Sequence, residues 1–154
     1  MRTVPTTSPP DRPGATPHSR GAACAPYTDA RSILLGEPHP DLRAIFTRLL
    51  RRAGHHVDDA CDAAAIIDTA RRMQPDLIII NLQELGAPTC RALRATFGTD
   101  TTPVILLSTT LRLDARTAAK AGANTYLELP AHTQTLLYRV RILLEKPDWS
   151  DLPP

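Results

Sequence analysis

The sequence predicts an α/β fold: a doubly wound, five-stranded parallel sheet with the strand order 2-1-3-4-5. Three observations lead to this prediction. Short apolar runs of strand length alternate with segments of helical spacing. The run at residues 77–80 is apolar throughout, which is typical of a strand buried on both faces. The length of 154 residues suits one domain.

The five strands are predicted from apolar runs bounded by turn residues. Gly36 bounds the first run, and Pro130 closes the last one. The second run is weaker than the others because aspartates and histidines interrupt it. The strands are expected over residues 32–35, 55–61, 77–80, 103–107 and 125–129.

The helices are predicted from apolar residues at helical spacing. The first begins at about residue 41 and carries Leu42, Ile45, Phe46, Leu49 and Leu50. Glycines stand where the first and fourth helices should stop, at Gly54 and Gly122. The remaining helices are expected through residues 66–73, over a short stretch at 90–96 after a loop with Gly86 and Pro88, and over 113–121 and 132–145.

Two tails flank the predicted domain, which covers residues 31–146. Residues 1–30 hold six prolines among small polar residues, and such a segment is expected to be disordered because it cannot bury enough apolar surface. Residues 147–154 form a short tail in which Trp149 is the only large apolar side chain.

Composition limits the classes of function. The net charge of +2 is too small to indicate a nucleic-acid partner from charge alone. No further domain is expected after residue 146, so no direct DNA binding is expected. There is no apolar run of membrane-spanning length and no signal-peptide pattern, which predicts a cytoplasmic protein without a membrane partner. Three scattered cysteines without a C-x-x-C pair predict reduced thiols and no zinc site.

Polar side chains gather at the predicted carboxyl ends of the strands, where ligands bind in such folds. Glu37 and His39 follow the first strand, and Asn81 ends the third. With Glu84 they could form a metal site, since imidazole and carboxylate suit a divalent ion. The alternative, a solvated polar cleft with no metal and no cofactor, is the interpretation we favour.

Four stretches of the chain resemble the receiver domain of two-component response regulators. They are residues 33–35 with 40–43, then 74–80, 102–108 and 121–127, and their order and spacing together are specific. The resemblance covers about residues 32–146 and implies the flavodoxin-like receiver fold. It also implies a signalling module and not an enzyme.

The resemblance assigns chemistry to positions that this chain fills differently. The acidic pair that binds magnesium falls on Glu37 and Pro38, or on Glu37 and His39. The phosphate-accepting aspartate falls on Asn81, and the lysine that contacts the phosphoryl group falls on Leu129. An amide is a far poorer nucleophile than a carboxylate. The sequence therefore predicts a degenerate phospho-acceptor pocket.

Two family positions keep their residue types. The hydroxyl residue is present as Ser108 and the aromatic switch as Tyr126. Either the two act as a switch driven by a partner, or they only pack beside a neutral pocket. The predicted function is an atypical, phosphorylation-independent, stand-alone pseudo-receiver that acts as a regulatory module by protein–protein interaction. The alternative is a sensor that holds a nucleotide, flavin or metabolite in the strand-end cleft, although no G-x-G-x-x-G run is present.

Two surfaces are candidates for partners. The family commonly uses the fourth helix, fifth strand and fifth helix for protein partners and homodimers, which points to one face of this chain. The arginines near the ends of the first two helices are expected to form a solvated basic face. The first face comprises Leu113, Tyr126, Tyr138, Arg139 and Arg141, and the basic residues are Arg48, Arg51, Arg52, Arg71 and Arg72.

Overall fold

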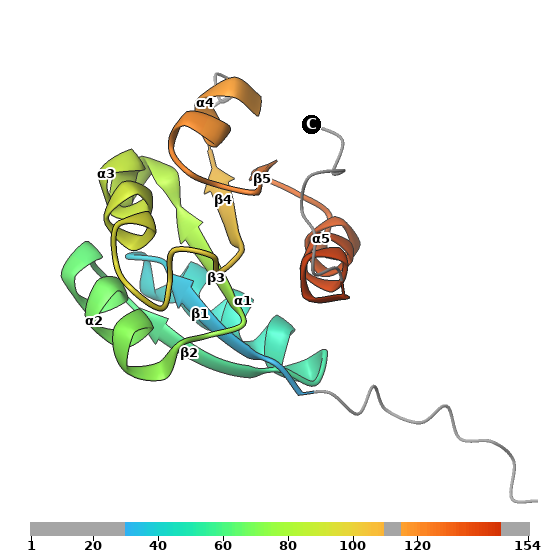
Figure 1. The fold of residues 1–154 in the computed structure, drawn as a ribbon. Coiled ribbons are helices and arrows are strands. Elements are labelled where there is room, and N and C mark those ends of the chain that lie inside the picture. The colour runs from blue at the N-terminus through green and yellow to red at the C-terminus, as the bar shows by residue number, and fades with distance from the viewer. Residues whose placement is uncertain (1–29, 110–114, 146–154) are drawn as a thin grey trace, which may run out of the picture.

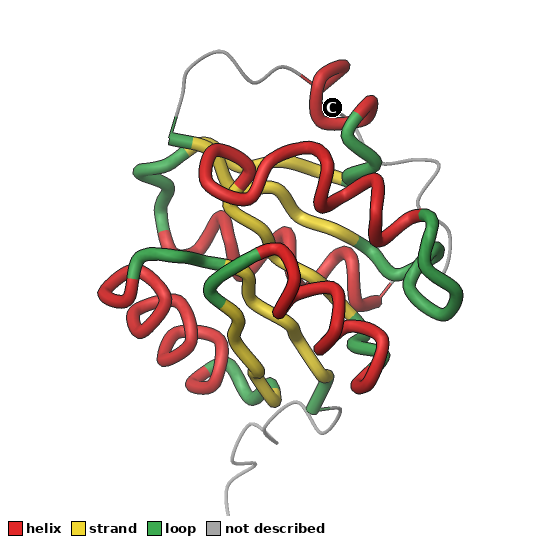
Figure 2. The backbone as a smooth tube through the Cα atoms, turned by 90° about the vertical axis from the view of Figure 1, so that its left-hand side faces the viewer, coloured by secondary structure: helices red, strands yellow, loops and turns green. Residues whose placement is uncertain are grey.

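A computed structural model describes residues 30–109 and 115–145 of the chain. Five parallel strands form one sheet in the order β2-β1-β3-β4-β5, which confirms the predicted fold class. Helices lie on both sides of these strands (Figures 1 and 2). In chain order the elements are β1 (Ser32–Gly36), α1 (Pro40–Arg52), β2 (His56–Ala60), α2 (Ala63–Met73), β3 (Leu77–Asn81), α3 (Leu82–Arg94), β4 (Val104–Ser108), α4 (Ala115–Lys120), β5 (Thr125–Glu128) and α5 (Thr133–Glu145).

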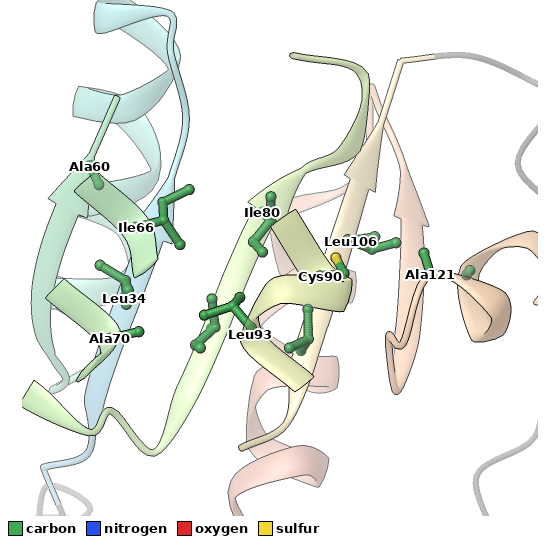
Figure 3. Close-up of a cluster of buried hydrophobic side chains, with 12 residues drawn as sticks. Leu34, Ala60, Ile66, Ala70, Ile80, Cys90, Leu93, Leu106 and Ala121 are labelled. Atoms are coloured by element: carbon green, nitrogen blue, oxygen red, sulfur yellow. The ribbon is translucent and has the colours of Figure 1, made fainter. Parts of the chain in front are cut away.

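The sheet separates two layers of buried apolar side chains. Because side chains alternate along a strand, Ile78 and Ile80 face one layer while Leu77 and Ile79 face the other. The first layer is packed by α2, α3 and α4, and Figure 3 shows Cys90 and Leu93 of α3 within it. The second is packed by α1 and α5. We call them the α2–α4 layer and the α1–α5 layer.

The helix ends follow the local sequence. Pro40 opens α1, where its missing N–H costs no hydrogen bond. Asp62 caps α2, since its Oδ1 accepts a hydrogen bond from the Ala65 amide at 2.8 Å. After α1 and α4 the chain turns at Gly54 and Gly122, whose φ angles are +96° and +88°. At both predicted helix ends, the glycine therefore has a backbone conformation that favours this residue type.

The third helix begins earlier than predicted. The sequence indicated a loop through Gly86 and Pro88 and a helix only from residue 90, whereas α3 already starts at Leu82. It is interrupted at Gly86, which has a non-helical conformation of φ 69° and ψ 165°. Pro88 starts the second helical segment without an N–H to satisfy. The turn residues therefore mark a break between two helical segments and not a continuous loop.

Other predictions are refined or lie beyond the described residues. Ile45 has the spacing of the apolar face of α1, yet its side chain is 55% exposed. The start of the fourth helix and Leu113 fall within residues 110–114, outside the described ranges. The same holds for the predicted tails apart from Ala30, so the domain boundaries stay predictions. In the described ranges, every helix is too short or too polar to span a membrane.

A half-buried arginine ties together the amino-terminal edge of the sheet. Arg94, at the end of α3, donates hydrogen bonds to five acceptors on the segments before β4 and β5. The side chain of Asn124 extends this network, since its Oδ1 also accepts from the Val104 amide at 2.8 Å. The five acceptors are the carbonyl oxygens of Thr99, Asp100, Thr102 and Gly122 and Oδ1 of Asn124, at 3.3, 3.1, 2.6, 2.8 and 2.8 Å.

Candidate functional site

Glu37 and Asn81 meet at the carboxyl edge of the sheet. They follow Gly36 and Ile80, which face each other in the parallel register of β1 and β3. The amide nitrogen Nδ2 of Asn81 donates a hydrogen bond to Oε2 of Glu37 at 3.1 Å. Both side chains are buried, with exposed fractions of 0% and 2%. The register of the two strands therefore brings together two of the predicted site residues.

The second carboxylate oxygen of Glu37 is also engaged. The backbone N–H of His39 donates to Oε1 at 2.9 Å, while the imidazole belongs to an exposed residue. The backbone N–H of Glu37 donates to the carbonyl of Ala60 at the end of β2, at 3.0 Å. A buried carboxylate is costly unless it is hydrogen-bonded, and here each oxygen accepts from the protein itself.

Arg43 holds the loop that carries Glu37, a role that the sequence analysis missed. Its Nη1 donates to the carbonyl oxygens of Glu37 and Pro38 at 2.8 and 3.2 Å. Its Nε lies 3.0 Å from Oδ2 of Asp59 on β2. The available signal was an arginine one turn into a helix, with an acidic pair on the adjacent strand. Arg43 thereby connects the loop after β1 to the edge strand.

The residues at this edge do not fit a magnesium ion, which the resemblance would place here. Mg²⁺ needs oxygen ligands in a near-octahedral arrangement. Among the described side chains of residues 37–39 and 81, the one carboxylate is that of Glu37; it accepts hydrogen bonds at both oxygens, and one of them comes from the Asn81 amide. Within the described residues no three His, Cys, Asp or Glu side chains are grouped for a metal. The side chain of Glu84 lies outside what the structure describes.

Ser108 and Tyr126 lie on neighbouring strands but are not directly opposite. Ser108 ends β4 and is 2% exposed. In the register of β4 and β5 it faces Glu128, whereas Tyr126 faces Leu106. Tyr126 is half-buried and packs against the α2–α4 layer. The two predicted switch residues therefore lie on adjacent strands, two positions out of register with each other.

Leu129 turns toward the core. It packs against the α1–α5 layer as a partly buried side chain. Its backbone N–H donates to the carbonyl of Ser108 at 2.7 Å, and the peptide bond to Pro130 is cis. The position predicted to lack a lysine is therefore occupied by an apolar side chain held by packing, and its backbone is tied to the end of β4.

The fold agrees with a comparison against protein families. The family model of the response regulator receiver domain matches residues 33–141. This chain belongs to that family. It is thus a receiver domain of two-component signalling, which confirms the family predicted from the sequence.

Known proteins of the family resemble the receiver domain over most of its length. Transcriptional regulatory protein PrrA of Mycobacterium leprae is 35% identical over 118 residues, which are 74% of this chain and 50% of that protein. RpaA of Synechocystis is 31% identical over 120 residues, 75% of this chain and 50% of that protein. The chain thus spans about half the length of these relatives. The structure of the chemotaxis response regulator CheY4 of Vibrio cholerae matches with a TM-score of 0.70 at 22% identity, covering 75% of this chain and all of that one.

These relatives correct one prediction. The sequence analysis expected no direct DNA binding, yet RpaA is named a DNA-binding dual master transcriptional regulator and PrrA a transcriptional regulatory protein. The expectation was wrong because it rested on residues 1–154 and their net charge of +2, whereas these relatives are about twice as long as the part that the chain matches.

The predicted partner face of the receiver domain is only partly described. Tyr138 on α5 is 60% exposed. Arg141 is exposed and pairs with Glu145, with its Nε 2.7 Å from Oε1. Arg139 is half-buried on the same helix, and Leu113 lies outside the described residues. The use of this face stays a prediction.

Proposed function

We propose that this receiver domain regulates a protein partner without accepting a phosphoryl group. The hydrogen bond from Asn81 to Glu37 carries the proposal. In the family resemblance, residue 81 is the nucleophile and Glu37 helps to hold the metal. Here the amide donates to the carboxylate, so the two groups satisfy each other.

The chemistry of the amide supports this proposal. Phosphoryl transfer to a protein requires a nucleophile that can form a covalent intermediate, and a neutral amide is a poor one. Asn81 is also 2% exposed and directs its nitrogen toward Glu37. A phosphoryl donor would therefore meet neither an ionised nucleophile nor an accessible one at this position.

The groups around Asn81 support it further. Transferred phosphoryl groups are stabilised by cations placed where negative charge develops. The position that the family fills with lysine holds Leu129, which packs against the α1–α5 layer. Only Glu37 remains of the acidic pair, since Pro38 has no carboxylate and His39 is exposed. Acceptor, metal pair and cation are altered together.

The function left to such a domain is recognition by its surface. The sheet, both core layers and the residues Ser108 and Tyr126 are present. The Glu37–Asn81 hydrogen bond joins the ends of β1 and β3 directly. We infer that the domain holds one conformation that its partner recognises, in place of two interconverted by phosphate. The small-ligand alternative gains no support from side chains as buried as Glu37, Asn81 and Ser108.

Intact-mass spectrometry after incubation with Mg²⁺ and acetyl phosphate tests the proposal. We expect no phosphoryl adduct on the native chain, and no chemical-shift change with Mg²⁺ and beryllofluoride. The matched control is the triple variant Pro38→Asp, Asn81→Asp, Leu129→Lys, which restores the three altered groups and is expected to gain an adduct. An adduct on the native chain that maps to residue 81, Glu37 or Glu84 overturns the proposal.

A further inference from the structure

A basic groove runs along α1 beside β2, the edge strand of the sheet. It has a volume of about 680 Å³ and is lined by Arg43, Arg48, Arg51 and Arg52 of α1 and by Asp59 of β2. The sequence analysis assigned three of these arginines to a solvated basic face. The structure adds a hollow between the helix and the strand, and a fourth arginine within it.

Positive charge is concentrated in this groove. Its four guanidinium groups and one carboxylate give a net charge of +3, because no other ionisable side chain of residues 30–109 or 115–145 lines the groove. The whole chain carries only +2, so everything outside the groove sums to −1. The small net charge of the chain thus hides a local concentration of positive charge. Such a concentration attracts a partner of negative charge.

The four arginines differ in their hydrogen bonds and ion pairs with the rest of the domain. Arg43 contacts Asp59 at 3.0 Å, and Nη2 of Arg51 donates to the carbonyl of Val57 at 2.8 Å. Arg48 and Arg52 are exposed and make no ion pair or hydrogen bond to the described residues. They are four residues apart on one helix, where like charges repel. Their guanidinium groups are therefore available to a bound anion.

The spacing of the arginines selects the shape of that anion. Arg43 and Arg52 are nine positions apart, which is about 13 Å along a helix that rises about 1.5 Å per residue. Nine positions also turn a helix of about 3.6 residues per turn by half a circle, so the two arginines flank the groove on opposite sides, with Arg48 on the side of Arg52. Phosphates follow one strand of a DNA duplex about every 3.4 Å of its axis, so the axial distance spans about four of them. A single phosphate reaches only one flank of the groove.

The groove lining argues against a protein partner. Protein interfaces depend on buried aromatic or aliphatic anchors at their centre. The apolar residues of this groove are only Pro40 and Ala44. The exposed Ile45 is on the same helix but does not line the groove. Guanidinium groups, by contrast, match phosphate oxygens with paired donors.

We propose that this groove binds the phosphate backbone of nucleic acid independently of base sequence. Among the described residues, the lining has no aromatic side chain to stack on a base and no Asn or Gln amide to read one. Binding is electrostatic and involves two to four phosphates. The inference goes beyond the proposed function and does not depend on it, because no groove residue lies at the position of Asn81, Ser108 or Leu129.

Fluorescence anisotropy with the full chain and a labelled DNA duplex of arbitrary sequence tests the proposal. We expect binding that weakens with salt, with a slope of log K against log salt of about −2 to −4, since each phosphate contributes about −0.9. A second duplex of unrelated sequence is expected to bind equally well.

Two double variants separate the groove from total charge. Arg48→Gln with Arg52→Gln removes the two groove arginines that make no ion pair or hydrogen bond to the described residues. This double variant is expected to make the slope of log K against log salt less steep by about 2. Arg71→Gln with Arg72→Gln removes two exposed arginines from the last turn of α2, outside the groove, and is expected to leave the slope unchanged. Thermal unfolding checks that both variants are folded.

Three results overturn the proposal. One is the absence of duplex binding at about 50 mM salt. Another is an equal loss of binding in the two double variants, which assigns the affinity to total charge. The last is a poly-glutamate peptide of equal charge that displaces the duplex from the native chain and binds more tightly than it, which identifies the groove as a site for an acidic protein.

Discussion

The amino ends and the carboxyl ends of the strands each hold a charged side chain within a hydrogen-bond network, but the two networks are built differently. We call these two sides of the sheet the amino edge and the carboxyl edge. At the amino edge, Arg94 donates to four backbone carbonyls and one side chain. At the carboxyl edge, Glu37 accepts from one backbone amide and from the side chain of Asn81. The first network depends mainly on the path of the chain, while half of the second depends on the identity of one residue.

This difference indicates which edge can change its chemistry. Four of the five acceptors of Arg94 are backbone carbonyls, which do not depend on the type of side chain that the loops carry. Gly122 is the exception, because its φ is +88° and a Cβ there would lie 2.9 Å from Cγ of Arg94. The Glu37–Asn81 pair is set by one amide, and a single substitution at residue 81 alters the charge, the donors and the nucleophile together. Chemistry is therefore easily gained or lost at the carboxyl edge, and the fold is held at the amino edge.

Removing Arg94 from the amino edge is expected to have the largest effect on the stability of the fold. Arg94→Met keeps much of the apolar stem but removes the guanidinium donor from five acceptors, of which Oδ1 of Asn124 and the Thr99 carbonyl keep a backbone N–H donor. Hydrogen bonds from a charged group contribute more than neutral ones, so we expect a loss of about 3 kcal/mol in the free energy of unfolding. Urea denaturation measures it. A loss below about 1 kcal/mol would show that the amino edge does not depend on this network.

At the carboxyl edge, Asn81→Asp is expected to destabilise the fold in a pH-dependent way. It places a second carboxyl group within hydrogen-bond distance of a buried carboxylate, which raises the pKa of the pair in the folded state. The unfolded chain then binds fewer protons than the folded one, so stability falls as pH rises. We expect the variant to be about 2 kcal/mol less stable than the native chain at pH 7 without Mg²⁺, and nearly equal to it near pH 4.

Asn81→Leu is the matched control for this experiment. It also removes the amide donor to Glu37 but adds no titratable group. We expect it to lose about 1–2 kcal/mol, since a buried acceptor remains unsatisfied. Urea denaturation at several pH values compares the two variants. If Asn81→Asp is no more pH-dependent than Asn81→Leu, the two carboxyl groups are not coupled.

The elements of the fold were predictable because their signals are local. Five apolar runs gave the five strands, and Gly54 and Gly122 marked helix ends where the backbone has positive φ. The break in α3 was misplaced because Gly86 and Pro88 suggest a loop, although helical turns continue on both sides of it. Local composition cannot distinguish a loop from a kink between two helical segments.

The site was predictable only as a set of positions. Glu37 and Asn81 were expected at one edge because parallel strands end there together, but their hydrogen bond joins residues 44 apart. The contacts of Arg43 with Asp59 and of Arg94 with Asn124 likewise join separate elements. No periodicity records such pairs, since they depend on how helices and loops are placed over the sheet.

Cys90, four residues before Arg94 on α3, tests whether burial outweighs the nearby arginines in setting the reactivity of a thiol. Burial raises the pKa of the Cys90 thiol to about 11, and the opposing effect of Arg94 and Arg91 is smaller. Near pH 8.5 its thiolate population is therefore on the order of 100-fold below that of an ordinary thiol. We expect iodoacetamide to modify the exposed Cys61 well before Cys90 in the folded protein, as followed by peptide mass spectrometry. Similar rates at the two thiols would contradict this.

The smallest expected effect concerns His55, which lies between the end of α1 and the start of β2. Burial lowers its pKa in the folded state, and its Nδ1 makes no hydrogen bond to the described residues. Arg31, Arg141 and Glu145 line the same hollow. Because the unfolded chain binds the proton more tightly, the native fold is expected to lose stability as pH falls through about 6.5. Urea denaturation at pH 7.5 and pH 5.5 should show a larger drop for the native chain than for His55→Gln, whereas equal drops would mean that the imidazole is as well solvated in the folded protein as in the unfolded chain.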